Sequence, residues 1–247
     1  METIKYKFEK EIPVVATADV VVIGGGPGGI CSAVMAARQG VDVLLVERYG
    51  ALGGMASFGE VSPFMSNHLD GVTLDKPLYG EWVRKMWEYL PESQRGKEFD
   101  DKIAVPLERQ ISKDLAMLGS EDLCLESGVR LLYHHNLIDV IMEGGKIIAA
   151  VFSSKSGLVA VKGKIFVDST GDGDLAVLSG CEYELGNEEG YCQPMTLCFK
   201  LSDVKPEGMP EIPGHPGVPD RQHINRLYDE AKAAGADVVG MEDLAER

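Results

Sequence analysis

Three glycines and one acid early in the chain have the types and spacing needed to hold the diphosphate and ribose of a dinucleotide. Gly24, Gly26 and Gly29 form the pattern G-x-G-x-x-G. Glu47 follows Gly24 by 23 positions. In this pattern the glycines allow a tight turn, close approach to a pyrophosphate and close helix packing, and the acid accepts hydrogen bonds from ribose hydroxyls. A carboxylate there repels a 2′-phosphate, which disfavours NADP.

The flanking residues predict the elements that would position these groups. A β-branched run from Asp19 to Ile23 predicts a strand before the turn, and a second strand is expected to end at Glu47. Between them we expect a helix that Gly40 terminates and whose start faces the phosphates. The helix face expected to lie on the sheet consists of Ile30, Ala33, Val34, Ala36 and Ala37.

Composition narrows the class of protein. The uncharged run from Val20 to Ala37 is long enough to suggest a membrane span, but GGGPGG within it would break such a helix. The net charge of −15, without a basic cluster, disfavours nucleic acid and anionic lipid as partners. The five cysteines form no C-x-x-C pair, and the N-terminus has no signal-peptide pattern. We therefore expect a cytoplasmic protein with no metal site and no membrane association.

A second glycine pair distinguishes a flavin site from a nicotinamide site. Gly53 and Gly54 follow the acid closely, where an ordinary NAD domain continues into another helix. With this pair, the chain resembles the FAD-dependent oxidoreductases of the glutathione-reductase-like superfamily, in the branch with fumarate reductases and 3-ketosteroid dehydrogenases. The resemblance rests on four segments: GGGPGG with Glu47, LGGMAS (52–57), DSTGDGDLA (168–176) and QPMTLCF (193–199).

The resemblance implies FAD as the cofactor and a set of residues that bind it. The first glycine turn would bind the pyrophosphate, the acid the ribose, the second glycine pair the ribityl chain, and the start of a β-meander the adenine. The implied cofactor-binding residues are Gly24, Gly26, Pro27, Gly28, Gly29, Glu47, Arg48, Gly53, Gly54, Met55, Ser57, Leu137, Ile138, Thr170, Gly171 and Asp172. Some relatives attach FAD through a histidine just before the second pair. Residues 49–52 here are Tyr-Gly-Ala-Leu, so non-covalent FAD is implied.

The expected fold is α/β, a Rossmann-like FAD-binding domain over residues 1–190 with a parallel central sheet and an antiparallel β-meander. Residues 58–106 would face the substrate side, and 191–247 would be the start of an incomplete substrate or cap domain. Glycine pairs and turns between 137 and 168 predict the meander, and Ile165 to Asp168 would return as a central strand. A helix is expected over 107–126, broken or bent near Gly119. Lys205 to Pro219 is expected to be a loop, followed by an amphipathic helix over 221–234.

Several other residues are weaker candidates for chemistry. The pair His134 and His135 would point to opposite faces of the meander, one toward solvent and one packed. Asp172 and Asp174 fit a turn that hydrogen-bonds FAD better than a metal site, because no third acid has ligand spacing. The remaining candidates are Trp82, Met86, Trp87 and Tyr89, read as core or as an aromatic wall near the substrate, and His68 and Arg84, read as surface residues or substrate contacts.

Three functions remain open from the sequence. The first is a FAD-dependent oxidoreductase that transfers hydride between a small organic substrate and flavin. The second is a flavin-binding subunit or fragment, inactive until a second polypeptide or a missing C-terminal half supplies the substrate domain. The third, a nicotinamide dehydrogenase, is disfavoured by the second glycine pair. No residue stands out as catalytic, and hydrolase and kinase motifs are absent from the sequence.

Overall fold

The computed structural model describes residues 3–4, 10–61, 68–69, 72–73, 78–95, 112–193, 195, 211–212, 215–219 and 221–235. The chain divides into two units, residues 1–198 and 199–247.

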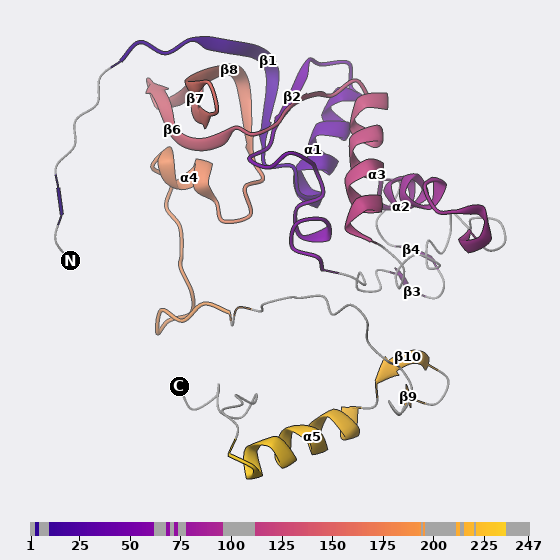
Figure 1. Cartoon of the computed structure of the whole chain (residues 1–247). Coiled ribbons are helices and arrows are strands. Elements are labelled where there is room, and N and C mark those ends of the chain that lie inside the picture. Colours follow the sequence, from indigo (N-terminus) through magenta and orange to yellow (C-terminus); the bar gives the residue numbers. More distant parts are fainter. Residues whose placement is uncertain are drawn as a thin grey trace. The chain divides into compact units, whose positions relative to one another are not determined.

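A six-stranded sheet forms the centre of the first unit, with the strand order β5-β2-β1-β8-β7-β6 (Figure 1). β5, β2, β1 and β8 run parallel to one another, whereas β8, β7 and β6 form an antiparallel meander. The parallel strands are β1 (Val14–Ile23), β2 (Val43–Val46), β5 (Arg130–Leu132) and β8 (Gly157–Asp168), and the meander adds β6 (Asn136–Glu143) and β7 (Lys146–Ser154). The predicted Rossmann-like α/β fold is confirmed.

Alternate residues of the parallel strands enter two different cores. On one face Val20, Val22 and Leu45 pack with the helices. On the other face Val21, Ile23 and Leu44 pack with meander residues such as Phe152 and Val161. Because side chains alternate along a strand, both faces of β1 and β2 must be apolar, which explains their unbroken hydrophobic runs. Figure 1 shows the resulting layers, with the meander on one side of β1 and β2 and the helices on the other.

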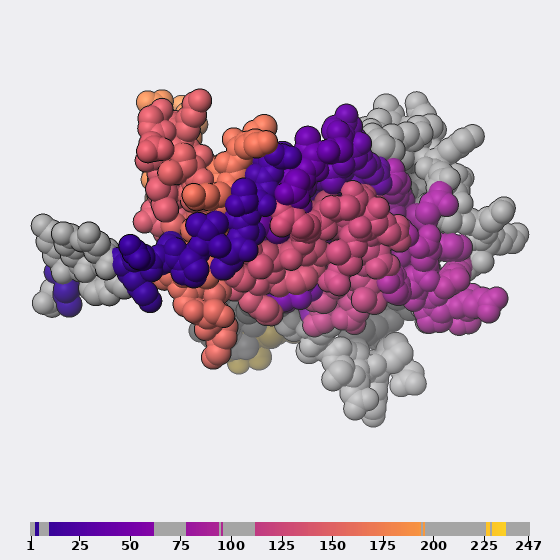
Figure 2. Space-filling view, turned by 90° about the horizontal axis from the view of Figure 1, so that it is seen from above, coloured from indigo at the N-terminus to yellow at the C-terminus, as the bar shows by residue number. Residues whose placement is uncertain are grey.

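Three helices, α1 (Pro27–Ala37), α2 (Leu78–Glu88) and α3 (Lys113–Glu126), form the helical layer. The expected break at Gly119 is wrong, since α3 is continuous through that position. A β-carbon on Gly119 would lie 2.9 Å from the backbone nitrogen of Met86. The glycine therefore serves the close approach of α2 and α3, not a break in the helix. In the space-filling view of Figure 2, the indigo β1 segment runs between atoms coloured as the meander and atoms coloured as α3.

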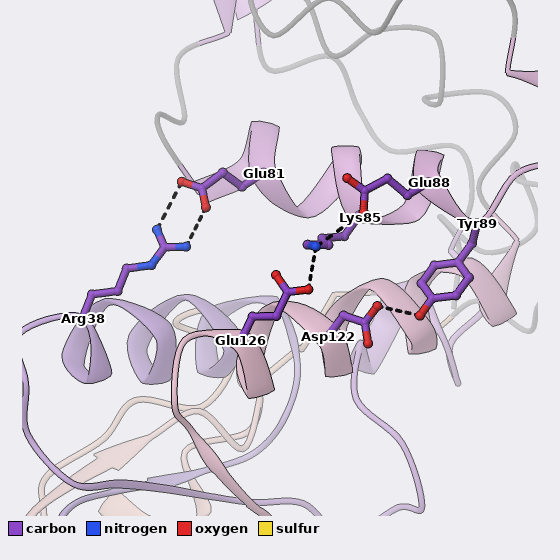
Figure 3. A network of polar contacts seen from close by, with 7 residues as sticks. All are labelled: Arg38, Glu81, Lys85, Glu88, Tyr89, Asp122 and Glu126. Carbon is purple, nitrogen blue, oxygen red and sulfur yellow. Dashed lines mark hydrogen bonds and ion pairs between the residues drawn. The ribbon is translucent and has the colours of Figure 1, made fainter.

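Polar contacts hold α2 against its neighbours (Figure 3). Arg38 at the end of α1 forms a two-pronged ion pair with Glu81, with N···O distances of 3.1 and 2.6 Å. Lys85 lies 2.7 Å from Glu126 of α3. Inside the layer, the Trp82 indole N–H donates to Ser120 Oγ at 2.8 Å. Trp82 and Met86 are buried in the helical core, which supports the core interpretation of this stretch.

The predicted return of Ile165 to Asp168 as a central strand is confirmed, because these residues end β8 and pair in parallel with β1, while the first half of β8 pairs with β7 of the meander. One expectation about this region needs correction. His134 and His135 lie in the connection between β5 and β6, so strand alternation does not apply to them. His134 instead has a φ of 58°, in the left-handed region that non-glycine residues seldom adopt.

Short elements complete the described part of the first unit. They are the 3-10 turns at Gly54–Ala56 and Glu92–Gln94, the two-residue strands β3 (His68–Leu69) and β4 (Val72–Thr73), and α4 (Asp174–Leu178). The predicted strand in QPMTLCF falls largely on residues outside the described ranges, as does the start of the helix predicted from 107.

In the second unit, a short antiparallel ribbon of β9 (Glu211–Ile212) and β10 (His215–Pro219) precedes α5 (Arg221–Ala233). The helix is confirmed. The expectation that 205–219 holds no regular element is wrong for 211–212 and 215–219. Both strands of a two-stranded ribbon are edges, where proline is tolerated because its missing N–H is not needed.

Candidate functional site

A cavity of about 910 Å³ lies at the carboxyl ends of β1, β2 and β8. Ile23, Val46 and Asp168, the last residues of these strands, all line it. Ligands bind at this edge of open parallel sheets, because the loops that leave the strands meet there. The volume is within the range of about 300 to 1,000 Å³ typical of ligand pockets.

The first glycine turn is built by contacts that tolerate no β-carbon at two of its positions. Gly24 has a φ of 104°, and a β-carbon there would collide with the carbonyl oxygen of Ser169. A β-carbon on Gly29 would collide with the carbonyl oxygen of Gly24. Gly26 differs, since its β-carbon would meet only the Cα of Gly54, at 3.9 Å. The first and third glycines thus shape the turn, and the second leaves space in the cavity.

The amino end of α1 opens into this cavity. Gly26, Pro27 and Gly28 line it, and Gly26 is the N-cap of the helix. The helix has no side-chain cap within the described chain and no acid in its first turn. The N–H groups of a first helical turn have no partner inside the helix, and the positive end of the dipole lies there. This end is therefore suited to an anion.

The second glycine pair lies directly against the first turn. The Gly53 N–H donates to the carbonyl of Gly25 at 2.8 Å, and a β-carbon on Gly54 would lie 2.8 Å from the Cα of Gly26. Both residues have positive φ values, 109° and 51°. The sequence predicts that both glycine turns lie along one ligand. The two turns must then be close to each other, as they are in the structure.

Glu47, at the end of β2, is only 6% exposed and holds the two loops around it. Its Oε2 accepts from the Gly25 N–H at 2.6 Å, and its Oε1 accepts from the Tyr49 N–H at 2.8 Å. A carboxylate has about four lone-pair sites, so two backbone donors leave acceptor capacity for a ligand. Glu47 lines the cavity, and its carboxylate is suited to accept hydrogen bonds from hydroxyl groups.

Asp168, the last residue of β8, holds the loop that follows this strand. Its Oδ1 accepts from the N–H and the hydroxyl of Thr170, and its Oδ2 accepts from the Ala176 N–H at 3.0 Å. Burial alone would raise the pKa of Asp168. The donated hydrogen bonds from Thr170 and Ala176 outweigh burial, and the pKa lies below its usual value.

Replacing Asp168 by asparagine is expected to lower the melting temperature, because a single amide oxygen cannot accept from both Thr170 and Ala176. The folded pKa of Asp168 lies below its unfolded value, so its stabilisation is complete above the unfolded value and is lost as pH falls through the folded one. The difference in melting temperature between the protein and Asp168→Asn should be constant near neutral pH and shrink below about pH 4. Thermal scans across pH measure it, and an unchanged difference at about pH 3 would contradict this role.

Most of the predicted cofactor residues come together on the cavity. Those that line it are Gly24, Gly26, Pro27, Gly28, Glu47, Arg48, Gly54, Met55, Leu137, Thr170, Gly171 and Asp172. Four others do not line it. Gly29 packs beneath the turn, and Gly53 supports the second pair. Ser57 is fully buried with its hydroxyl on the Gly54 carbonyl, and Ile138 is 39% exposed on β6.

Several lining residues were not predicted from the sequence. An aromatic pair, Tyr49 and Phe58, stacks with ring centroids 4.4 Å apart and joins the end of β2 to the second glycine loop. The Arg48 guanidinium lies 5.0 Å from the Tyr49 ring centre. The other unpredicted lining residues include Gly25, Gly59, Asn136 and Ser169, whereas His135 and Asp174, two of the weaker candidates, also line the cavity. Gly25 could have been predicted from the sequence, because it lies inside the glycine run GGGPGG.

The weaker candidates are mostly placed away from this cavity. Arg84 lines a separate hollow of about 380 Å³ among the helices, with Arg38 and Glu81. Tyr89 donates its hydroxyl to Asp122 on the helical layer. The side chain of His68 is outside the described part. No cluster of three or more potential metal ligands occurs among the described residues, and no helix in the described ranges is long and apolar enough to cross a membrane.

Comparisons with known proteins find relatives of part of this chain. Digeranylgeranylglycerophospholipid reductase of Thermoplasma volcanium is 29% identical over 162 residues, which are 63% of this chain and 39% of that protein. Thiamine thiazole synthase of Methanococcus vannielii is 28% identical, over 71% of this chain and 64% of the synthase. The 3-ketosteroid-Δ4-(5α)-dehydrogenase structure from Rhodococcus jostii RHA1 is 17% identical, with a TM-score of 0.42 over 63% of this chain and 46% of that one. The chain thus spans about 39% of the length of the reductase that it matches.

A family described as FAD dependent oxidoreductase matches residues 19–243, which include the glycine turns, Glu47 and the Asp168 loop. That match covers well over half of the chain, and the chain belongs to the FAD dependent oxidoreductase family.

Proposed function

We propose that the first unit holds FAD through its ADP half, and that the protein serves hydride transfer between a small organic substrate and the flavin. The observation that carries this proposal is the convergence of both glycine turns, Glu47 and the 168–174 loop on one cavity. FAD, bound there, supplies the redox chemistry. The residues of this chain bind and orient it.

The geometry suggests a role for each part of the cavity. The amino end of α1 would face the pyrophosphate, with Gly26 leaving the space that the phosphates need. Glu47 would accept hydrogen bonds from the ribose hydroxyls. The 53–57 loop would lie along the cofactor from the pyrophosphate toward the ribityl group. Leu137 would contact the adenine, and Thr170, Gly171 and Asp172 would hydrogen-bond the cofactor. Gly29, Gly53, Ser57 and Ile138 would act through the residues they support.

Binding without a covalent bond remains part of the proposal. Leu52, just before the glycine pair, is fully buried, and its side chain has no nucleophile. Among the described lining residues, Arg48 supplies the cation, whereas Glu47, Asp168, Asp172 and Asp174 supply carboxylates. Phosphate binding would therefore depend on backbone N–H groups and the helix dipole more than on cationic side chains.

We also retain a second candidate, a flavin-binding subunit or fragment that cannot turn over alone. The chain spans 39% of the reductase it matches, which supports a substrate domain supplied by other residues or by a second polypeptide. Solution size and flavin reduction by candidate small molecules, measured on the 247-residue chain, separate the two. A monomer that binds FAD and reduces it with a substrate would exclude this second candidate.

The purified chain is expected to bind FAD in preference to NAD and NADP. Denaturation of the protein, followed by identification of the released chromophore, tests both the cofactor and its non-covalent attachment. Reconstitution with FAD is the companion measurement for protein purified without it. Failure to bind any flavin after reconstitution would refute the cofactor assignment, and flavin retained on the denatured chain would refute non-covalent binding.

A further inference from the structure

The second glycine loop, residues 53–61, has one face in the core and one face toward the cavity. Ala56 and Ser57 are buried, whereas Met55 and Phe58 are exposed and line the cavity. The start of the loop is fixed to the first glycine turn by the hydrogen bond that the Gly53 N–H donates. The positions of Met55 and Phe58 in the cavity then depend on what holds the other end of the loop.

An ion pair between Glu60 and Lys113 holds that other end. Directly after Gly59, which lines the cavity, the chain turns at Glu60 with a φ of 50°. The Glu60 carboxylate oxygen Oε1 lies 2.9 Å from Nζ of Lys113, the first residue of α3. Because α3 packs in the helical core through Ala116, among others, the ion pair joins the end of the loop to a well-packed helix.

Both partners of this ion pair occupy positions that local rules disfavour. Among the described residues, Glu60 and His134 are the non-glycine residues with positive φ, and each adjoins a residue that lines the cavity. Lys113 lies at the positive end of the α3 dipole, where an acid is preferred. The Glu60 carboxylate accepts a hydrogen bond from Lys113 and raises the pKa of its ammonium group. Backbone strain persists where surrounding contacts maintain it, and it gathers at ligand sites.

We propose that the Glu60–Lys113 ion pair positions the second glycine loop against the flavin-bearing half of FAD. Neither residue lines the cavity, so both act as positioning residues through Met55, Phe58 and the loop backbone. This inference rests on the proposed function, because that function places the ribityl chain along this loop. ADP lacks the ribityl chain and the flavin ring. The ion pair should therefore strengthen the binding of FAD and leave the binding of ADP unchanged.

Calorimetric titration of the flavin-free 247-residue chain with FAD and with ADP tests the proposal. The unmodified protein should bind FAD more tightly than ADP. Glu60→Lys and Lys113→Glu each bring two like charges together, and each should reduce this preference for FAD by about threefold to tenfold. The double variant with both changes restores an ion pair with its charges exchanged. Its preference for FAD should return to within about twofold of the unmodified value.

Glu126→Lys is the matched control, because it reverses one charge of another ion pair of α3, with Lys85, outside the cavity lining. It should leave the preference for FAD over ADP unchanged. Melting temperatures check folding, and the neutral variants Glu60→Gln and Lys113→Met decide where a charge-reversed protein does not fold.

A general loosening of the protein would weaken FAD and ADP equally, and that result in the single variants would overturn the inference. An unchanged preference for FAD would overturn it too, as would a folded double variant that recovers nothing or the same reduction in Glu126→Lys. In each of these outcomes, FAD binding by the unmodified chain leaves the proposed function intact. Failure of the unmodified chain to bind either FAD or ADP would overturn both.

Discussion

Gly26→Ala is expected to abolish most FAD binding while leaving the flavin-free protein folded. The new methyl group would meet only the Gly54 Cα, at 3.9 Å, and would project into the cavity where the pyrophosphate is proposed to lie. The backbone at Gly26 has a φ of −74°, which alanine adopts without strain. A clash between this methyl group and the pyrophosphate would cost about 1 to 3 kcal/mol of binding free energy. The FAD affinity should therefore fall by about tenfold to a hundredfold.

Gly29→Ala provides the matched comparison, because the same methyl group is added three residues later. There it would collide with the Gly24 carbonyl oxygen, so the flavin-free protein itself should lose stability. The measurements are the melting temperature without FAD and the dissociation constant for FAD. Equal loss of stability in both variants, or normal FAD affinity in Gly26→Ala, would show that the second glycine does not face the phosphates.

The strand, helix and turn of the nucleotide-binding half could be predicted because local rules determine them. Glycines with positive φ, such as Gly24, and buried β-branched runs leave few alternatives. The same holds for the meander, whose strands are joined by two-residue turns at Gly144–Gly145 and Lys155–Ser156. These features depend on neighbours in sequence, so the pattern alone specifies them.

The unpredicted features depend on contacts between distant segments. Gly119 has the sequence appearance of a helix breaker, but the backbone of α2 packs against it. Tyr49 and Phe58 form a stacked pair only because the second glycine loop folds back onto the first. His135 enters the cavity because the chain leaves β5 beside the backbone of Glu47. No local periodicity carries information of this kind.

Glu47→Ala is the second substitution with a large expected effect, and the structure gives it two consequences. Loss of the ribose contacts should weaken FAD binding by about tenfold to a hundredfold, because charge-assisted hydrogen bonds contribute about 1.5 to 3 kcal/mol. Loss of the acceptor for the Gly25 and Tyr49 N–H groups should also lower the stability of the flavin-free protein. The unfolding free energy should fall by about 1 to 3 kcal/mol for the buried Gly25 donor left without a partner, and by less for the half-buried Tyr49 donor.

Because the two effects overlap, the ribose role is best isolated by changing the ligand as well as the protein. ADP and 2′-deoxy-ADP differ only by the 2′-hydroxyl, one of the ribose hydroxyls from which Glu47 is proposed to accept hydrogen bonds. The unmodified chain should prefer ADP by about tenfold, whereas Glu47→Ala should bind the two nucleotides alike, whatever its overall affinity. Any general loosening of the glycine turn affects both ligands equally and cancels in the ratio. A preference for ADP that persists in Glu47→Ala would mean that this carboxylate only holds the Gly25 and Tyr49 backbone and that another group binds the ribose.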